Sequence, residues 1–193
     1  MNHFEFSDEE LIKKFQDGDN GAFSEIVNRY KDRLYNFIYR FVNDVDKAED
    51  LLQDTFLKLY THKDSYKEIA KFSTWLYTIA ANISKSELRK IKMRKTFSVS
   101  DFPKANQEAI FKSPESNLES KINSINIEKN IQSALSGLSI DFKTIIILRD
   151  IQELSYDDIS KITNTPIGTV KSRINRARLK LQKLLTINGE RLI

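Results

Sequence analysis

The chain has 193 residues, a formal net charge of +4, 40% hydrophobic residues, five glycines and three prolines. This length suits one domain or two small ones, and the scarcity of glycine and proline favours an all-α fold over a turn-rich β fold. The absence of cysteine excludes a disulfide framework and a thiolate metal site. The N-terminus lacks the features of a signal peptide and the longest apolar run is too short to span a bilayer, so the sequence predicts a soluble cytoplasmic protein.

Hydrophobic residues recur at helical spacing along most of the chain, which predicts a series of α-helices. In the first half we expect helices at about 7–15, 22–42, 46–60 and 73–93, the first opened by a Ser7-x-x-Glu10 capping box. In the second half we expect them at about 118–135, 139–150, 156–162 and 166–185. The polar and aromatic segment between the third and fourth helices is expected to be a loop.

Helical periodicity is lost from about residue 95 to residue 117, where Pro103, Pro114 and several serines and asparagines occur. The sequence therefore predicts a flexible linker at 96–117, a first domain at 1–95 and a second domain at 118–193. Fully stretched, a linker of about 22 residues reaches about 75 Å, and as a flexible coil it averages about 25 to 30 Å. The predicted architecture is two small helical domains on a tether.

The helix predicted at 46–60 has an acidic outer side, on which Asp50, Gln53, Asp54 and one leucine, Leu57, lie together. One interpretation is a solvated acidic surface with a single exposed leucine, which is common in proteins. The other is a protein-binding patch with an apolar centre, a place from which DNA would be repelled. A carboxylate metal site is a third alternative, but no histidine lies nearby and the acids form no tight cluster.

The helix predicted at 73–93 is basic along one flank. Along this flank lie Trp75, Thr78, Asn82, Lys85, Ser86 and Arg89, with Lys92 and further cations beyond them. Either Trp75 is a core aromatic and the lysines are solvated, or the flank is a nucleic-acid surface. A surface of that kind could read single-stranded bases by stacking. The neighbouring loop supplies His62, Tyr66 and Phe72 as candidate rings.

The segment 154–185 predicts a helix, a short turn and a second helix. Ser155 suits the start of the first helix, while Thr165 can cap the second and Pro166 suits its first position. The second helix has an apolar side formed by Ile167, Val170, Ile174, Ala177, Leu181 and Leu184. Its other side is basic, and no acid occurs between Pro166 and Leu184. The helix is either an ordinary cationic surface helix or a recognition helix for the DNA major groove, and the short turn favours the second alternative.

Motifs of nucleotide-binding, metallopeptidase and hydrolase sites are absent from the sequence. With His3 and His62 as the only histidines and no cysteine, a nucleophile–base pair is not expected. We therefore expect no enzymatic activity, no cofactor and no metal.

Three stretches of the chain are similar to conserved segments of one protein family. In chain order they are DKAEDLLQDTFLKLY (46–60), FSTWLYTIAANISKSELRK (72–90) and LSYDDISKITNTPIGTVKSRINRARLKL (154–181). They resemble the polymerase-binding segment, the minus-ten-reading helix and the minus-thirty-five-reading helix-turn-helix of the extracytoplasmic-function (ECF) type of bacterial RNA polymerase sigma factor. The resemblance implies a subunit that binds core RNA polymerase, recognises a two-part promoter and is held inactive by an anti-sigma factor.

The resemblance also implies roles for individual residues. The acidic face of Asp50, Gln53, Asp54 and Leu57 would bind polymerase. Asn82 matches a base-contacting asparagine, and Lys85, Arg89 and Lys92 would hold the minus-ten strand. The loop before Phe72 matches the part that captures a flipped base. The matches to the minus-thirty-five contacts are Thr169, Lys171, Ser172, Arg173 and Arg176.

The sequence departs from the family pattern at two places in the minus-ten reader. Ser86 stands where an acid is frequent, and Ala81 stands where arginine is common. Two other functions fit the same residues less well. A stand-alone helix-turn-helix regulator would not use the acidic face, and a helical adaptor would bind DNA with little dependence on salt.

Overall fold

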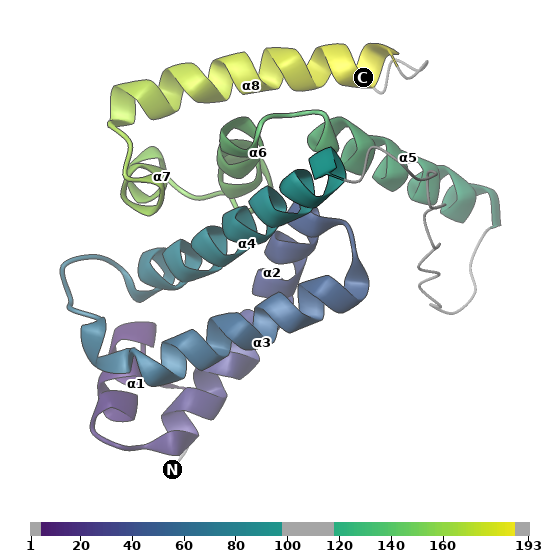
Figure 1. The fold of residues 1–193 in the computed structure, drawn as a ribbon. Helices are drawn as coiled ribbons and strands as arrows, with labels where there is room; N and C mark the ends of the chain where they lie inside the picture. The colour runs from purple at the N-terminus through teal and green to yellow at the C-terminus, as the bar shows by residue number, and fades with distance from the viewer. Residues whose placement is uncertain (1–4, 98–117, 188–193) are drawn as a thin grey trace.

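A computed structural model describes residues 5–97 and 118–187. These residues form α1 (Asp8–Gln16), α2 (Asn20–Val42), α3 (Val45–Thr61), η2 (Lys63–Ser65), α4 (Phe72–Phe97), α5 (Leu118–Ser136), α6 (Ile140–Ile146), η3 (Ile147–Ile151), α7 (Tyr156–Thr163) and α8 (Ile167–Ile187). None of the described residues lies in a strand, and the predicted all-α class is confirmed (Figure 1).

Helix ends in the first half follow from capping side chains. The predicted capping box is present, because Ser7 Oγ accepts from the Glu10 amide and the Glu10 carboxylate accepts from the Ser7 amide at 2.7 Å. Asp19 caps α2, and Asp44 caps α3 by accepting from the Lys47 amide. Between these two helices Asn43 adopts a left-handed conformation (φ 53°), so the chain turns within two residues. As a result α2 and α3 pack side by side.

Two of the helices differ in length or type from those expected. Helix α4 continues to Phe97, over the first two positions of the expected linker, and the remainder of that linker, residues 98–117, lies outside the described residues. The helix expected at 139–150 is α6 followed by η3, a π-helical turn. The expected loop between α3 and α4 contains the 3₁₀ turn η2.

The first domain is a bundle of α1 to α4 around a core of large apolar side chains. The fully buried ones include Phe15, Leu34, Phe37, Phe41, Leu59, Phe72 and Leu76. Burying side chains of this size is the main source of stability for a bundle this small. The bundle thereby fixes the outer faces of α3 and α4 relative to one another.

The second domain consists of α5 to α8, with α7 and α8 joined by a short turn. Ser155 caps α7, and Asn164 ends it in a left-handed conformation. The Thr165 hydroxyl donates back to the Thr163 carbonyl at 3.1 Å, which ties the turn to the last residue of α7. Val170, Ile174 and Ala177 are buried as the pattern predicts.

The expectation that Ile167 belongs to the buried side of α8 is wrong, since 45% of this residue is exposed. It is the first residue of the helix, where the chain is still leaving the turn. The side chain therefore has no neighbouring helix to pack against.

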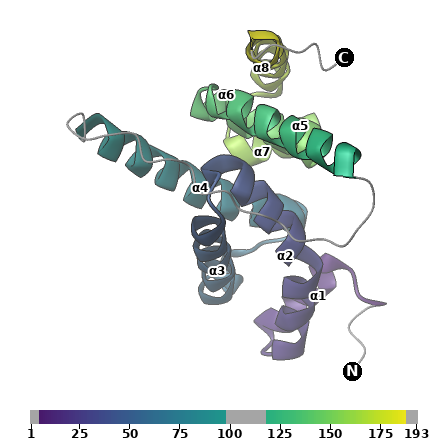
Figure 2. The same cartoon turned by 90° about the vertical axis from the view of Figure 1, so that its right-hand side faces the viewer.

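The two domains pack directly against each other. Figures 1 and 2 show α6 and α7 lying between α4 of the first domain and α8 of the second. The C-terminal end of α2 also meets the second domain, where Lys143 Nζ donates to the Phe41 carbonyl at 2.8 Å. A tether between two domains does not require this contact, and no local pattern in the sequence predicts it.

Candidate nucleic-acid and protein interfaces

Helix α3 presents its acidic face to solvent. Asp50, Gln53, Asp54 and Leu57 are all exposed, and Leu57 is 60% exposed. The opposite side of the helix is anchored by Ala48, Leu51 and Leu59, which are buried. Because the core holds this side, the helix cannot rotate to hide the leucine. The four candidate polymerase-binding residues therefore share one exposed face.

The apolar part of this face is larger than one leucine. Tyr60, one turn further along α3, is 48% exposed, and its ring lies 5.3 Å from that of Phe23. The helical pattern of the sequence did not mark Tyr60 as part of this surface. Among the described residues, no group of three or more acidic or histidine side chains is placed to hold a metal ion.

Helix α4 carries the candidate minus-ten residues along one stripe. Asn82, Arg89 and Lys92 are exposed, while Lys85 is half-buried. Their spacing of three or four residues places them on neighbouring turns of one helix side. The structure thus brings an amide and three cations together on a single face. Glu87, the only acid within this stretch, is buried and pairs with Lys90 at 3.6 Å.

The expected aromatic surface of the preceding loop is wrong for two of its three rings. Phe72 is fully buried and Tyr66 is 8% exposed. Both rings contact half-buried Trp75, with centroids 6.2 and 5.5 Å away. These rings pack together beneath the loop as part of the hydrophobic core, because burying aromatic rings is favourable. Of the candidate rings only His62 is exposed.

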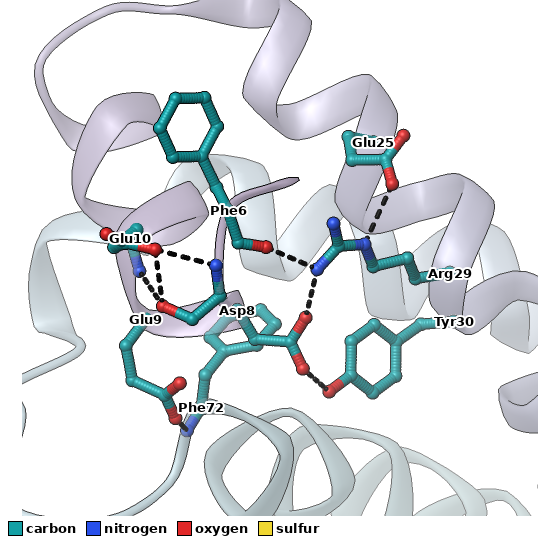
Figure 3. A network of polar contacts seen from close by, with 9 residues as sticks. Phe6, Asp8, Glu9, Glu10, Glu25, Arg29, Tyr30 and Phe72 are labelled. Carbon is teal, nitrogen blue, oxygen red and sulfur yellow. Dashed lines mark hydrogen bonds and ion pairs between the residues drawn. The ribbon is translucent and has the colours of Figure 1, made fainter. Parts of the chain in front are cut away.

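Helix α1 holds the loop before α4 at both ends, as Figure 3 shows for the Phe72 end. The Phe72 amide donates to Glu9 Oε1 at 3.0 Å. Gln16 Nε2 donates to the carbonyls of Lys63 (2.7 Å) and Tyr66 (3.2 Å). These bonds join residues about fifty to sixty positions apart, for which the sequence contains no local signal. The loop proposed by resemblance to capture a base is therefore braced by α1.

A partly buried polar network ties α1 to α2 next to this brace (Figure 3). Arg29 Nη1 donates to Asp8 Oδ1 (3.0 Å) and to the Phe6 carbonyl (2.9 Å), and its Nε donates to Glu25 (2.8 Å). Tyr30 donates its hydroxyl to Asp8 Oδ2. Burial, followed by the bond to Asp8, raises the pKa of Tyr30 well above its usual range, so this hydroxyl stays a donor.

Helix α8 presents the candidate minus-thirty-five residues next to its buried stripe. Lys171, Ser172 and Arg176 are exposed, whereas Thr169 and Arg173 are half-buried. Arg178, which the pattern places on the same basic side, pairs with Asp150 through its Nε at 3.0 Å. That bond directs Arg178 towards η3, away from the other cations.

Lys85 of the candidate minus-ten surface and Arg173 of the candidate minus-thirty-five surface line the same pocket between the domains. The pocket is lined by Lys85, Asp141, Thr144, Ile145, Thr163, Thr165, Val170 and Arg173. Burial lowers the pKa of Lys85, as do Arg89 and Arg173, while Asp141 acts in the opposite direction. The domain contact thus withdraws part of each basic surface from solvent.

Comparisons with known proteins place both halves of the chain in one family. The model for sigma-70 region 2 matches residues 26–94, and the model for sigma-70 region 4 matches residues 128–181. The first range contains α3 and most of α4, and the second contains α7 and most of α8. The chain thus has the two-part organisation of a sigma factor.

Individual relatives resemble nearly the whole chain. The ECF RNA polymerase sigma factor SigW of Bacillus subtilis is 36% identical over 182 residues, covering 90% of this chain and 94% of the relative. The ECF sigma-E factor of Escherichia coli is 35% identical over 176 residues, covering 90% and 92%. The solved structure of the sigma factor RpoE of Bartonella quintana, in complex with the anti-sigma factor NepR, is 31% identical with a TM-score of 0.66. That alignment covers 86% of this chain and 97% of RpoE.

The chain therefore belongs to the ECF family of RNA polymerase sigma factors. A further structure, that of CnrH in complex with the cytosolic domain of CnrY, shares the fold at 21% identity and a TM-score of 0.70. It covers 94% of this chain and 99% of CnrH. In the part of the chain that the structure describes, no helix has the length and apolar character that crossing a membrane requires.

Proposed function

We propose that this protein is a sigma factor that binds core RNA polymerase and directs transcription initiation from a two-part promoter. The observation that carries the proposal is the presence of three surfaces of different character on one chain. An acidic and apolar face lies on α3, and two basic faces lie on α4 and α8. A DNA-binding regulator needs the basic faces, but it has no use for the acidic face, which DNA would repel.

The α3 face would bind polymerase through Asp50, Gln53, Asp54 and Leu57. An exposed leucine surrounded by carboxylates suits a basic protein surface with an apolar pocket, because the charges orient the approach and the leucine is buried on contact. Tyr60 would extend the apolar part of the contact.

The basic faces would read the promoter. On α4, Asn82 would contact a minus-ten base, while Lys85, Arg89 and Lys92 hold the strand through its phosphates. On α8, the groove contacts would be Thr169, Lys171, Ser172, Arg173 and Arg176. The corresponding domains are 1–95 and 118–193, with a linker at 96–117.

Regulation by an anti-sigma factor fits the same family. RpoE of Bartonella quintana, a relative that aligns with most of this chain, was solved in complex with one. We therefore include an anti-sigma factor among the partners of this protein. The role proposed is non-enzymatic and cytoplasmic, since the sigma factor meets polymerase and chromosomal DNA there.

The α3 face can be tested by the double substitution Asp54→Lys and Leu57→Glu. We expect core-polymerase affinity to fall at least tenfold, because a carboxylate is replaced by a cation and the apolar leucine by a charged side chain. Binding is measured with purified core enzyme by a pull-down titration. The control is Ile127→Glu on α5, an exposed apolar residue outside the three surfaces, which should leave affinity unchanged. Unchanged binding of the double variant would contradict the proposal and favour a stand-alone regulator.

A further inference from the structure

The residue that precedes α4 cannot cap the helix. The first amides of an α-helix have no carbonyl partner within it, and a side-chain oxygen at the preceding position normally accepts from one of them. Here that position holds Lys71, whose side chain can only donate. The acceptor comes from another helix instead, because the amide of Phe72 donates to Glu9 Oε1 of α1 at 3.0 Å (Figure 3). Glu9 therefore caps the helix that carries the candidate minus-ten residues.

The neighbouring carboxylate, that of Asp8, ties the same turn of α1 to α2. One of its oxygens accepts from Arg29 at 3.0 Å, and the other accepts from the hydroxyl of Tyr30. The ring of Tyr30 meets the ring of Phe72 edge to face, with the centroids 5.8 Å apart. Phe72 is thus held at its amide by Glu9 and at its ring by a residue bonded to Asp8.

The loop between η2 and α4 is fixed at several points along its length. Tyr66 is buried, its carbonyl accepts from Gln16, and its hydroxyl donates to the carbonyl of Ala70 at 2.8 Å. Its ring also lies edge to face with that of Phe72, at 5.7 Å. A backbone held at these points has little freedom left to lose when a ligand binds to it.

The other side chains of this loop point to solvent. Lys67, Glu68, Ile69 and Lys71 are exposed, and Ile69 is 85% exposed. An isoleucine this exposed leaves apolar surface in water, so a ligand with an apolar face that covers it is bound favourably. The face of an unpaired base is such a surface, and the two lysines suit the phosphates on either side of it. The loop therefore has the chemistry of a preformed site for an unpaired base.

We propose that Glu9 is a positioning residue for minus-ten recognition, because it holds the start of α4 and the adjoining loop in the geometry that receives an unpaired base. The proposal rests on the sigma function proposed above and names a residue that organises its minus-ten site in advance. Binding of a strand to a mobile loop costs the free energy of ordering that loop, and a loop fixed beforehand avoids this cost. Glu9 acts through Phe72 and does not itself contact DNA.

The test replaces Glu9 with alanine in the full chain. The complex with core polymerase is titrated with a fluorescent single-stranded oligonucleotide that carries the downstream element selected from a promoter library. In a matched series, each base of the element is replaced in turn by an abasic site. The measured quantity is the ratio of the dissociation constants for the abasic and intact strands. Unfolded protein weakens the apparent binding of both strands alike, so a purely structural effect leaves this ratio unchanged.

In the wild type we expect one position at which loss of the base weakens binding by about tenfold or more. In Glu9→Ala this ratio should fall to about threefold or less, because the loop must then be ordered by the strand. Glu9→Gln should keep the wild-type ratio, since its amide oxygen can still accept from Phe72. The matched control Asp44→Ala removes a carboxylate that caps α3 in the same domain, and it should also keep the ratio.

If Glu9→Ala does not fold, Glu9→Asp replaces it in the test. This variant retains the charge but is one methylene too short to reach the amide of Phe72, and the same fall of the ratio is expected. A wild-type ratio in both variants would overturn the proposal, as would an equal fall in Asp44→Ala or a wild-type series in which no position dominates. These outcomes leave the sigma function standing. If the wild-type complex binds the element no more tightly than an unrelated strand, the proposed function fails instead.

Discussion

At the scale of single residues, the hydrogen bonds and ion pairs of each basic side chain decide whether it remains available to DNA. Arg173 and Arg178 lie five positions apart on α8 and look equivalent in the sequence. In the structure Arg178 is held by Asp150, whereas Arg173 lies beside the pocket at the N-terminal part of the helix. The N-terminal part is the section of a recognition helix that contacts base edges.

For this reason Arg173→Ala should weaken binding to the cognate minus-thirty-five element by about 1 to 3 kcal/mol relative to altered elements. Binding of the polymerase complex to promoter variants, followed by fluorescence anisotropy, measures the difference. Arg178→Ala serves as the control and should not change sequence preference. An equal loss on every sequence would make Arg173 a phosphate anchor.

Burial of Lys143 makes the free energy of unfolding depend on pH. It is 96% buried, and burial lowers its pKa to about 8. The unfolded chain keeps this proton up to about pH 10.5, so between these pH values the unfolded state binds more protons. The contribution of Lys143 to the free energy of unfolding therefore rises from about pH 8 to pH 10.5.

Comparison with Lys143→Met isolates this effect from other titrating groups. From pH 7.5 to pH 10, the free energy of unfolding of the wild type should rise by about 2 kcal/mol relative to the variant. Urea denaturation at the two pH values gives both quantities. Parallel changes in the two proteins would show that Lys143 is not desolvated.

At the scale of elements, α1 positions the loop that precedes α4. Gln16→Glu keeps the size of the side chain but replaces a donor with a carboxylate, which can only accept. Two hydrogen bonds would be lost and the carboxylate would face two carbonyls. We expect the free energy of unfolding to fall by about 1 to 3 kcal/mol in chemical denaturation.

Gln182→Glu, at an exposed position of α8, is the control and should change stability by no more than about 0.5 kcal/mol. Limited proteolysis would report on the loop itself, and cleavage within 62–71 should become faster in Gln16→Glu only. If both variants were equally stable, the loop would not depend on α1.

Local patterns in the sequence predict the elements well because capping and periodicity act over a few residues. Ser7 with Glu10 and Ser155 at the start of α7 mark true helix starts, and the exposed Leu57 follows from the helical wheel. Contacts between distant residues leave no such pattern. The burial of Phe72, the brace from Gln16 and the bond between Thr74 and Asp158 depend on tertiary packing, so the sequence could not predict them.

At the scale of the whole molecule, the protein combines three surfaces with a contact that hides part of two of them. The acidic face of α3 lies outside the domain interface and stays exposed in the packed form. The roles proposed for α4 and α8 rest on the family resemblance, and most of the residues involved are exposed.

The most direct test is transcription from a randomised promoter library with purified core polymerase and the wild-type chain. We expect transcripts only when the protein is added, and enrichment of two short elements whose separation matches the minus-ten and minus-thirty-five positions. Arg173→Ala should relax preference in the upstream element alone, and Asn82→Ala in the downstream element alone. Transcription that does not depend on the protein, or enrichment of a single element insensitive to both substitutions, would contradict the account.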